Sequence, residues 1–562
     1  MPGGLLNLVA YGNQNVFLNG NPSKTFFKTT YAKYTNFGLQ KFRIDFSGQR
    51  TFRMSESSVF DFTVPRYGDL LMDTYMVVNL PNIWSPVIPP QVTESDGGSI
   101  LENWQPYEFK WIENIGTQMI ERVRFTVGGA VIQEFTGSYL INLVERDFTD
   151  EKKRLYYEMT GNVSDLNDPA NRYGTSAYPS ALYSGTDPAY TQLYDQVGSE
   201  PSIRGRQLYV PLNIWFTLAS KMAFPIVSLQ YAELKIEITI RPVQELFTVS
   251  KIYLTNDELS TDSKLREYIQ PNFNDSRYQF YRFLQSPPAL EIASSLAYKD
   301  QRTNWNADIH IISTYAFITE DEVRKFASEP QKYMIKQSYT SVFENVVGTR
   351  RLDLKSLGVV SNWMWFFQRT DVASRNQWSN YTNWSYPTPH SLPFQESASA
   401  QLSLNPAADM TSIYNTGLYT SMNTRDIMNT WALILDGKYR ETQLESGVLD
   451  YVEKYVRTSG AAPSGVYCYN FALNSGPFDF QPSGAMNMSK FSTVQFEVAT
   501  IQPPLDARAQ VTTISSPITK EVVAVQMPKS GIYQYQYNMI VMEERYNILN
   551  IQNGVAGLEF AR

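Results

Sequence analysis

The chain has 562 residues, with 48 Lys and Arg against 55 Asp and Glu, which gives a net charge of −7 at neutral pH. Only 18% of the residues are charged and 14% are aromatic, so the chain can form sizeable cores and does not have the composition of a disordered protein. One cysteine and two histidines exclude an intrachain disulfide, a cysteine-based zinc or iron–sulfur site and a His-rich metal centre, and the acidic balance argues against coating a nucleic acid.

The first predicted element is an N-terminal arm, residues 1–24, which is rich in Asn and Gly. It carries one apolar patch, formed by Leu5, Leu6, Leu8 and Val9. Such a patch on an arm usually has a docking site, on its own domain or on a neighbour. We expect no signal peptide and no membrane span, because the basic and long apolar regions that these need are missing. The lone cysteine fits a reducing compartment.

After the arm, alternation of apolar and polar residues is the dominant signal, and it predicts strands. Residues 234–240 (LKIEITI) alternate with a period of two, which is typical of a strand with one buried face. The pairs Gly128-Gly129 and Asp436-Gly437 stand between such runs and predict hairpin turns. Many strands separated by turns indicate a β-sandwich or β-barrel class.

Helices are expected to be short, and the best candidate covers residues 319–328. Thr319 and Glu322 have the spacing of a capping box. Val323 and Phe326 form one apolar face, and a proline follows the helix.

An internal repeat predicts two similar domains, 25–329 and 330–562. Four blocks occur twice in one order: a turn hairpin, an apolar strand, a proline turn leading to an alternating strand, and a late long strand. Chance similarity of two β-domains is the alternative. The spacing between equivalent residues falls along the chain, so we expect longer loops in the first copy, at 146–208 and 245–306. The first copies lie at 125–135, 209–216, 224–240 and 307–322, and the second at 433–443, 466–473, 481–498 and 533–545.

Five segments, spread over nearly the whole chain, together carry a resemblance to a known family. They are GGLLNLVAYGNQNVFLNGNPSKTFFKTTYAKYTNF (3–37), YVPLNIWFTLASKMAFPIVSLQYAELKIEI (209–238), YAFITEDEVRKFASEPQKYMIKQ (315–337), YCYNFAL with FQPSGAMNMSKF (within 467–491) and GVAGLEFAR (554–562). In this order they resemble the major capsid protein family of nucleocytoplasmic large DNA viruses. The chain departs from the family at 352–368, which lacks a frequent His-Pro strand, and the loops 146–208 and 372–428 match nothing in it.

The resemblance implies an all-β fold of two consecutive eight-stranded jelly rolls, a double jelly roll, with long loops and a few short helices. It also implies a homotrimer with a hexagonal outline, a capsomer that tiles an icosahedral shell. The implied partners are further copies of the chain, minor capsid proteins and a penton protein, with an internal viral membrane as an indirect neighbour and no direct contact with nucleic acid. The implied location is the virion, after assembly in the host cytoplasm.

The residues themselves offer no convincing catalytic site, so we expect a protein that is not an enzyme and holds no metal or cofactor. His310 lies in an alternating run and is interpreted as structural, His390 as a loop residue, and Cys468 as a buried inert thiol. Neighbouring carboxylates on a strand point to opposite faces, and the set at 320–322 caps the predicted helix, so we expect no acid–base pair among them. The carboxylate groups considered are Asp257/Glu258, Glu320/Asp321/Glu322 and Glu543/Glu544.

Three alternatives to a capsid protein stay open. The polar segment 376–387 (NQWSNYTNWSYP) could serve a two-domain β-sandwich that binds carbohydrate by stacking on Trp378 and Trp384, although an ordered surface or trimer-contact loop fits it as well. The others are a capsid-like scaffold protein absent from the mature particle, and a carbohydrate-processing enzyme on a β-sandwich. Sequons mark five candidate glycosylation sites: Asn162, Asn274, Asn380, Asn383 and Asn487.

Overall fold

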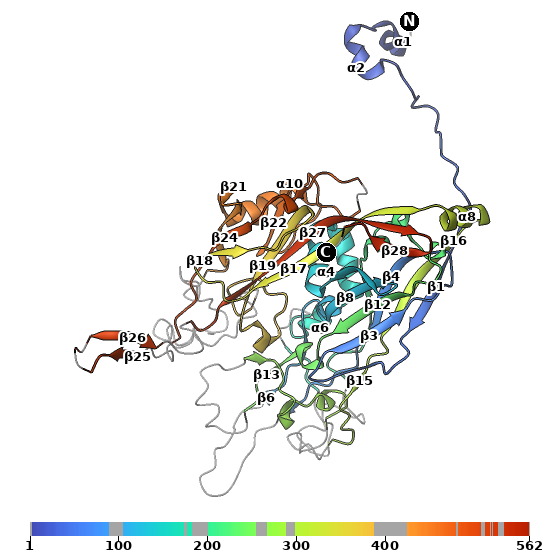
Figure 1. Ribbon diagram of the computed structural model, residues 1–562. Coiled ribbons are helices and arrows are strands. Elements are labelled where there is room, and N and C mark those ends of the chain that lie inside the picture. The colour runs from blue at the N-terminus through green and yellow to red at the C-terminus, as the bar shows by residue number, and fades with distance from the viewer. Residues whose placement is uncertain are drawn as a thin grey trace.

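Two β-sandwiches and an N-terminal arm make up the chain (Figure 1). We describe them from a computed structural model. The described residues are 3–88, 105–172, 177–181, 200–253, 267–287, 298–386, 424–478, 481–506, 512–517, 519, 521–526 and 533–560.

Two antiparallel sheets form the first sandwich. The sheet β1–β16–β4–β10 consists of Gly38–Asp45, His310–Phe317, Leu70–Asn79 and Gln207–Pro211, and β11 (Phe224–Pro225) also pairs with β4. The sheet β3–β12–β8–β9 consists of Ser58–Thr63, Leu234–Ile240, Ile120–Val127 and Ala130–Phe135. The predicted alternating strand is β12, and the predicted Gly128-Gly129 turn joins β8 to β9 with positive φ at both glycines.

The second sandwich repeats this design. Its sheet β17–β27–β19–β22 consists of Gln331–Phe343, Tyr537–Gln552, Val359–Arg369 and Val466–Asn470, and β23 (Met486–Asn487) and β28 (Val555–Leu558) extend it. Its other sheet, β18–β24–β20–β21, consists of Thr349–Asp353, Val494–Thr500, Met428–Leu435 and Lys438–Glu445. The predicted Asp436-Gly437 turn joins β20 to β21.

Strand order confirms the predicted fold class. When the eight main strands of each sandwich are numbered along the chain, both sandwiches have the sheets 1-8-3-6 and 2-7-4-5. This is the arrangement of a jelly roll, so the chain is a double jelly roll. The repeated sequence blocks correspond to equivalent strands and turns, since both hairpins join strands 4 and 5. The predicted domain boundary at 329 and 330 falls between the helix α8 and β17.

Further elements lie in the connections. The helices are α1 (Gly3–Val9), α2 (Val16–Asn19), α3 (Ile115–Gln118), α4 (Gly137–Asp147), α5 (Asp150–Thr160), α6 (Ser164–Asn167), α8 (Glu320–Ser328) and α10 (Glu453–Arg457), with a π-helical turn at Val448–Val452. The short strands are β2 (Thr51–Phe52), β5 (Val87–Ile88), β6 (Gln105–Pro106), β7 (Lys110–Trp111), β13 (Phe247–Ser250), β14 (Tyr268–Ile269), β15 (Trp305–Asn306), β25 (Thr512–Ser515) and β26 (Val522–Gln526).

The helix predicted at 319–328 is α8, and Thr319 stands at its N-terminal end. The Thr319 hydroxyl donates to the Glu322 carboxylate at 3.2 Å. The segment 146–208, expected to be a loop, instead contains α5 and α6 and the end of α4. Acidic residues in the first turn of α5 favour its N-terminal end, and Gly161 ends it in the left-handed conformation.

Strand β19 is buried on both faces, and this explains how the two sandwiches meet. Its residues Trp363 and Trp365 belong to the core of the second sandwich, where the rings of Trp365 and Trp431 stack with centroids 5.3 Å apart. On its opposite face, Met364 and Phe366 pack into the core that fills the first sandwich. The outer face of the sheet β17–β27–β19–β22 therefore lies inside the molecule.

The connections between strands 5 and 6 differ most between the two sandwiches. In the first sandwich this connection covers residues 136–206 and includes α4, α5 and α6. In the second it covers only residues 446–465, with the π-helical turn and α10. The expectation of longer loops in the first copy is confirmed at this connection.

Candidate functional site

Two of the reactive side chains considered from the sequence, His310 and Cys468, are buried. His310 is 3% exposed, and its Nδ1 lies 2.7 Å from the backbone oxygen of Asp308. Cys468 is 1% exposed, and burial raises the pKa of its thiol to about 11, which suits an inert position. Both placements agree with structural roles, while His390 lies outside the described residues.

The neighbouring carboxylates do not face one another. Glu543 accepts a hydrogen bond from Trp363 Nε1 at 2.6 Å on the side of the second core. Glu544 accepts one from Arg146 at 2.8 Å on the opposite side of the strand. Asp257 and Glu258 lie outside the described residues. In the described part of the chain, no group of three His, Cys, Asp or Glu side chains is placed to hold a metal ion, and no helix is long and apolar enough to cross a membrane.

The five sequon asparagines differ in accessibility. Asn274 and Asn487 are exposed, and Asn162 is half-buried. Asn380 and Asn383 are buried, and their side-chain nitrogens donate to the backbone oxygens of Trp384 and Thr424. Glycosylation at all five stays a prediction, and accessibility favours Asn274 and Asn487.

The aromatic segment after β19 packs against the first sandwich. Trp378 Nε1 donates to the backbone oxygen of Glu245 at 3.0 Å, and the Arg241 guanidinium lies 4.4 Å from the centre of the Trp378 ring. Tyr381 packs on Phe366 with ring centroids 4.3 Å apart. These contacts are those of an ordered contact loop, and the Arg241 side chain covers one face of the Trp378 ring.

A buried charge cluster joins the two sandwiches, and it involves residues that the sequence analysis did not single out. Arg146, at the end of α4, is fully buried and donates to Asp147, to Asn362 on β19 at 3.0 Å and to Glu544 on β27 at 2.8 Å. Tyr139 on α4 also donates to Glu544, at 2.9 Å. These contacts fix α4 of the first sandwich on the outer sheet face of the second.

Charges within this cluster are balanced. Two cations, Arg146 and Lys336, face two carboxylates, Glu544 and Asp147. Lys336 Nζ lies 3.8 Å from Glu544. Glu544 is buried, which by itself would raise its pKa, but Arg146 and Lys336 outweigh this cost and lower it to about 2. The available signal was a group of charged residues at the end of each of two mostly apolar runs, YLINLVERD and YNMIVMEER. The pairing itself spans almost 400 residues and cannot be read from spacing.

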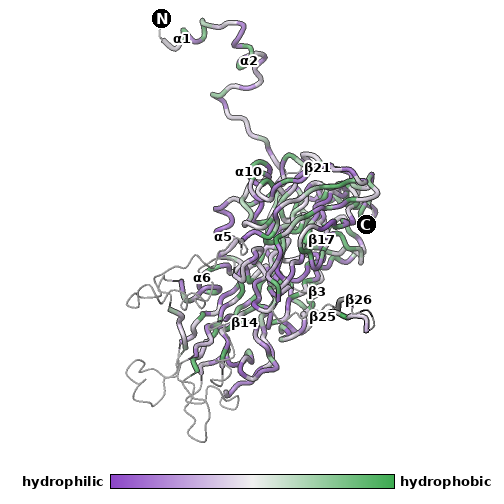
Figure 2. The backbone as a smooth tube through the Cα atoms, turned by 90° about the vertical axis from the view of Figure 1, so that its left-hand side faces the viewer, coloured by the Kyte–Doolittle hydropathy of each residue, from purple (hydrophilic) through white to green (hydrophobic). Residues whose placement is uncertain are grey.

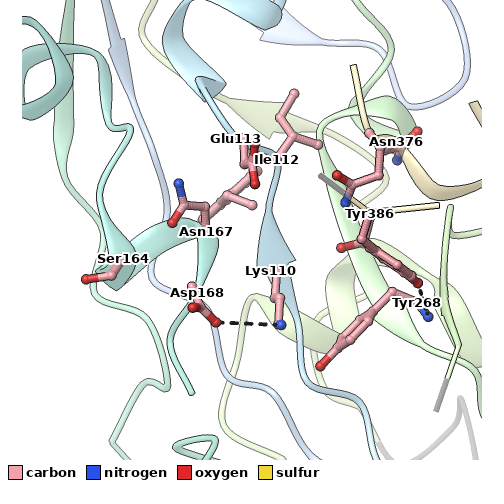
Figure 3. Close-up of a pocket in the computed structure, with 12 residues that line it drawn as sticks. Lys110, Ile112, Glu113, Ser164, Asn167, Asp168, Tyr268, Asn376 and Tyr386 are labelled. Carbon is pink, nitrogen blue, oxygen red and sulfur yellow. Dashed lines mark hydrogen bonds and ion pairs between the residues drawn. The ribbon is translucent and has the colours of Figure 1, made fainter. Parts of the chain in front are cut away.

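Loop contacts between the sandwiches also enclose a cavity of about 290 Å³ (Figure 3). Lys110 lies in it between Asp168, 3.8 Å from Nζ, and the Tyr268 ring, 4.2 Å away. Asn376, from the second sandwich, donates to two backbone oxygens of the first at 2.8 Å. Burial lowers the pKa of Lys110. Its lining residues come from both sandwiches, so the cavity is a feature of the contact between them.

The arm presents the other unusual surface. Residues 3–37 extend away from both sandwiches in two perpendicular views (Figures 1 and 2), and α1 and α2 have no buried residue. Phe17, Phe26 and Phe27 are each more than 90% exposed. Thr35, at the base of the arm, donates to Glu322 on α8 at 2.7 Å. So much exposed apolar area on an extended segment is typical of a binding surface.

Comparison with protein families matches most of the chain. The family described as "Major capsid protein N-terminus" matches residues 25–272, and the family "Large eukaryotic DNA virus major capsid protein" matches residues 322–557.

Individual relatives agree with these families. The chain is 26% identical to the major capsid protein of Phaeocystis pouchetii virus over the full length of both proteins. It is 31% identical to that of Chrysochromulina ericina virus over 60% of this chain and 52% of that protein. Among solved structures, the Faustovirus major capsid protein superposes with a TM-score of 0.58 at 13% identity, covering 94% of this chain and 93% of that one.

Proposed function

The chain belongs to the major capsid protein family of large eukaryotic DNA viruses, and we propose that it works as a homotrimer that forms one near-hexagonal capsomer of an icosahedral shell. The observation that carries this proposal is the presence of one strand arrangement twice in a single chain. Three such chains around a three-fold axis place six similar sandwiches around it. A near-hexagon can cover a surface by repeating one kind of edge contact.

A fixed angle between the two sandwiches supports the same proposal. A tile keeps its outline only if its halves do not hinge. The α4 contact supplies this rigidity, because apolar packing surrounds hydrogen-bonded charges that have no access to water. Separating the sandwiches would expose the apolar faces of β19 and β27 and break the cluster around Arg146.

In this proposal the work of the protein is geometric and not enzymatic. Its partners are further copies of itself, minor capsid proteins and a penton protein, with an internal membrane as an indirect neighbour. The net charge of −7 gives no reason for direct contact with nucleic acid. The protein is then located in the virion, after assembly in the host cytoplasm.

Native mass and particle shape test the proposal. We expect the purified protein to sediment as a trimer of about 193 kDa, three times 64.3 kDa, and to show hexagonal outlines by electron microscopy. A stable monomer at micromolar concentration would contradict it. A trimer that is missing from purified virions would instead identify a scaffold protein of the same fold.

A further inference from the structure

Helix α4 shows how one sandwich docks on another. It follows β9, the fifth strand of the first sandwich, and its residues Tyr139, Asn142 and Arg146 lie on one stripe. Tyr139 and Arg146 hydrogen-bond to Glu544 on β27, and Arg146 also donates to Asn362 on β19. The helix after strand 5 of one sandwich thus covers the outer face of the 1-8-3-6 sheet of the next.

The second sandwich has a helix in the same position. The π-helical turn Val448–Val452 and α10 follow β21, the fifth strand of the second sandwich. In both places a hydroxyl residue and a glycine lie at the junction of strand and helix, Thr136-Gly137 in the first and Ser446-Gly447 in the second.

Alignment on these glycines shows what α10 presents. Asn142 corresponds to Val452, and Arg146 corresponds to Val456. Asn142 and Arg146 are buried, but Val452 is 53% exposed and Val456 57% exposed, and the adjacent Tyr455 is 91% exposed. Val452, Tyr455 and Val456 form the α10 face. At the second helix, the residues equivalent to Asn142 and Arg146 are therefore apolar and open to solvent, while Leu449, equivalent to Tyr139, is buried in the core of the second sandwich.

The sheet that would receive the α10 face is β1–β16–β4–β10. On the outer face of this sheet Tyr75 of the third strand pairs with Ile312 of the eighth, and on the outer face of the sheet that receives α4 Met364 pairs with Met542 between the same two strands. Met364 and Met542 are buried at the junction. Tyr75 and Ile312 are only half-buried, and Tyr209 beside them is 39% exposed. These three residues form the first-sheet face.

We propose that the α10 face of one chain docks on the first-sheet face of a second copy, as α4 docks on the second sandwich within the chain. This inference rests on the proposed homotrimer and names its contact surfaces. The two faces lie at opposite ends of the molecule, α10 and β21 at one end and β1 and β16 at the other (Figure 1). A contact between two different surfaces is head-to-tail, and it closes into a ring when the rotation between copies fits.

The contact between chains differs chemically from the contact within the chain. Within the chain, Arg146 meets Glu544 without access to water. Between chains the α10 face brings valine and tyrosine to a sheet face of tyrosine and isoleucine. Chains that fold separately can make this contact without first burying an unpaired ion, which is a large cost.

The first test changes the α10 face in the full-length protein. V452D/V456D places two carboxylates on the face, and V555D/L505D is a matched control because Val555 and Leu505 are 63% and 66% exposed elsewhere. We expect trimers from the wild type and the control in sedimentation velocity. The V452D/V456D protein should be a monomer with an unchanged far-ultraviolet circular dichroism spectrum, its trimer dissociation constant raised at least about tenfold.

Disulfide trapping gives a second readout that does not depend on weakened assembly. V452C/I312C should form chains linked in twos and threes on a non-reducing gel after mild oxidation, and each single variant should not. The native Cys468 gives little background because it is buried.

The outcomes separate the two proposals. If the wild type and V452D/V456D are both trimers and V452C/I312C forms no cross-link, the docking mode is wrong. The homotrimer then still stands, and the α10 face is free for another virion protein. A monomeric wild type overturns the proposed function itself.

Discussion

Arg146 connects segments that are far apart in the sequence and close together in the fold. Its guanidinium binds Asp147 beside it on α4, Asn362 on β19 and Glu544 on β27. Removing one partner from such a buried cluster leaves a charge without compensation and costs several kcal/mol, whereas a surface pair contributes little. The rigidity of the contact between the sandwiches therefore depends on a few side chains.

Replacing Glu544 tests this dependence through pH. Because the folded-state pKa of Glu544 is lowered from 4.5 to about 2, its carboxylate stabilises the folded protein fully above about pH 4.5, and this contribution disappears as the pH falls to about 2. We expect E544Q to lose about 3 kcal/mol of stability at pH 7, since one unit of pKa corresponds to about 1.4 kcal/mol. Denaturant midpoints of wild type and E544Q should converge as the pH is lowered through this range.

A half-buried carboxylate with an exposed partner provides the control. Glu497 pairs with Arg351 at 2.6 Å, but the Arg351 side chain is 60% exposed. E497Q should change stability by less than about 1 kcal/mol at pH 7. Equal losses for E544Q and E497Q would show that the charge cluster does not hold the sandwiches together.

At the scale of elements, α4 begins in a confined space. The Thr136 hydroxyl accepts a hydrogen bond from the Tyr139 amide at 3.2 Å, and Gly137 follows as the first helical residue. A Cβ atom on Gly137 would lie 2.1 Å from the Thr117 oxygen and 2.4 Å from the Ile120 oxygen. Both are backbone atoms of packed elements and cannot turn away.

G137A should therefore displace α4 and weaken its contact with the second sandwich. We expect a loss of about 1–3 kcal/mol and a lower thermal midpoint. G557A is the matched control, because a Cβ atom there meets nothing within 4 Å. If calorimetry gives the same midpoint for both variants, the helix start is not the tight point described here.

Strands and turns could be predicted from the sequence far better than helices and long-range pairs. The alternation in β12 and the glycine turns at both hairpins carry their structure locally, so they are found where expected. Helix α4 was missed because its run YLINLV is apolar on every side, as a buried segment is, and shows no clear helical period. The cluster around Arg146 was missed because only the fold brings its members together. The significance of the exposed Val452 and Val456 likewise becomes clear only when the two sandwiches are compared in space.

At the scale of the whole molecule, the arm is the part least connected to the rest. We expect deletion of residues 1–24 to leave the thermal midpoint of the sandwiches unchanged, because α1 and α2 contribute no buried residue. Brief proteolysis of the wild type should remove the arm first and leave a resistant body. A midpoint that falls by several degrees after the deletion would show that the arm docks on its own trimer and stabilises it.

The unequal connections after strand 5 bear on how such tiles fit together. A particle with six identical corners would sit in a lattice equally well after a turn of 60°. In the proposed trimer, three of the six sandwiches would carry the long connection of residues 136–206 and three the short one of residues 446–465. A tile turned by one corner would bring unlike margins together. In that trimer the length difference would therefore give every capsomer two distinguishable orientations relative to its neighbours.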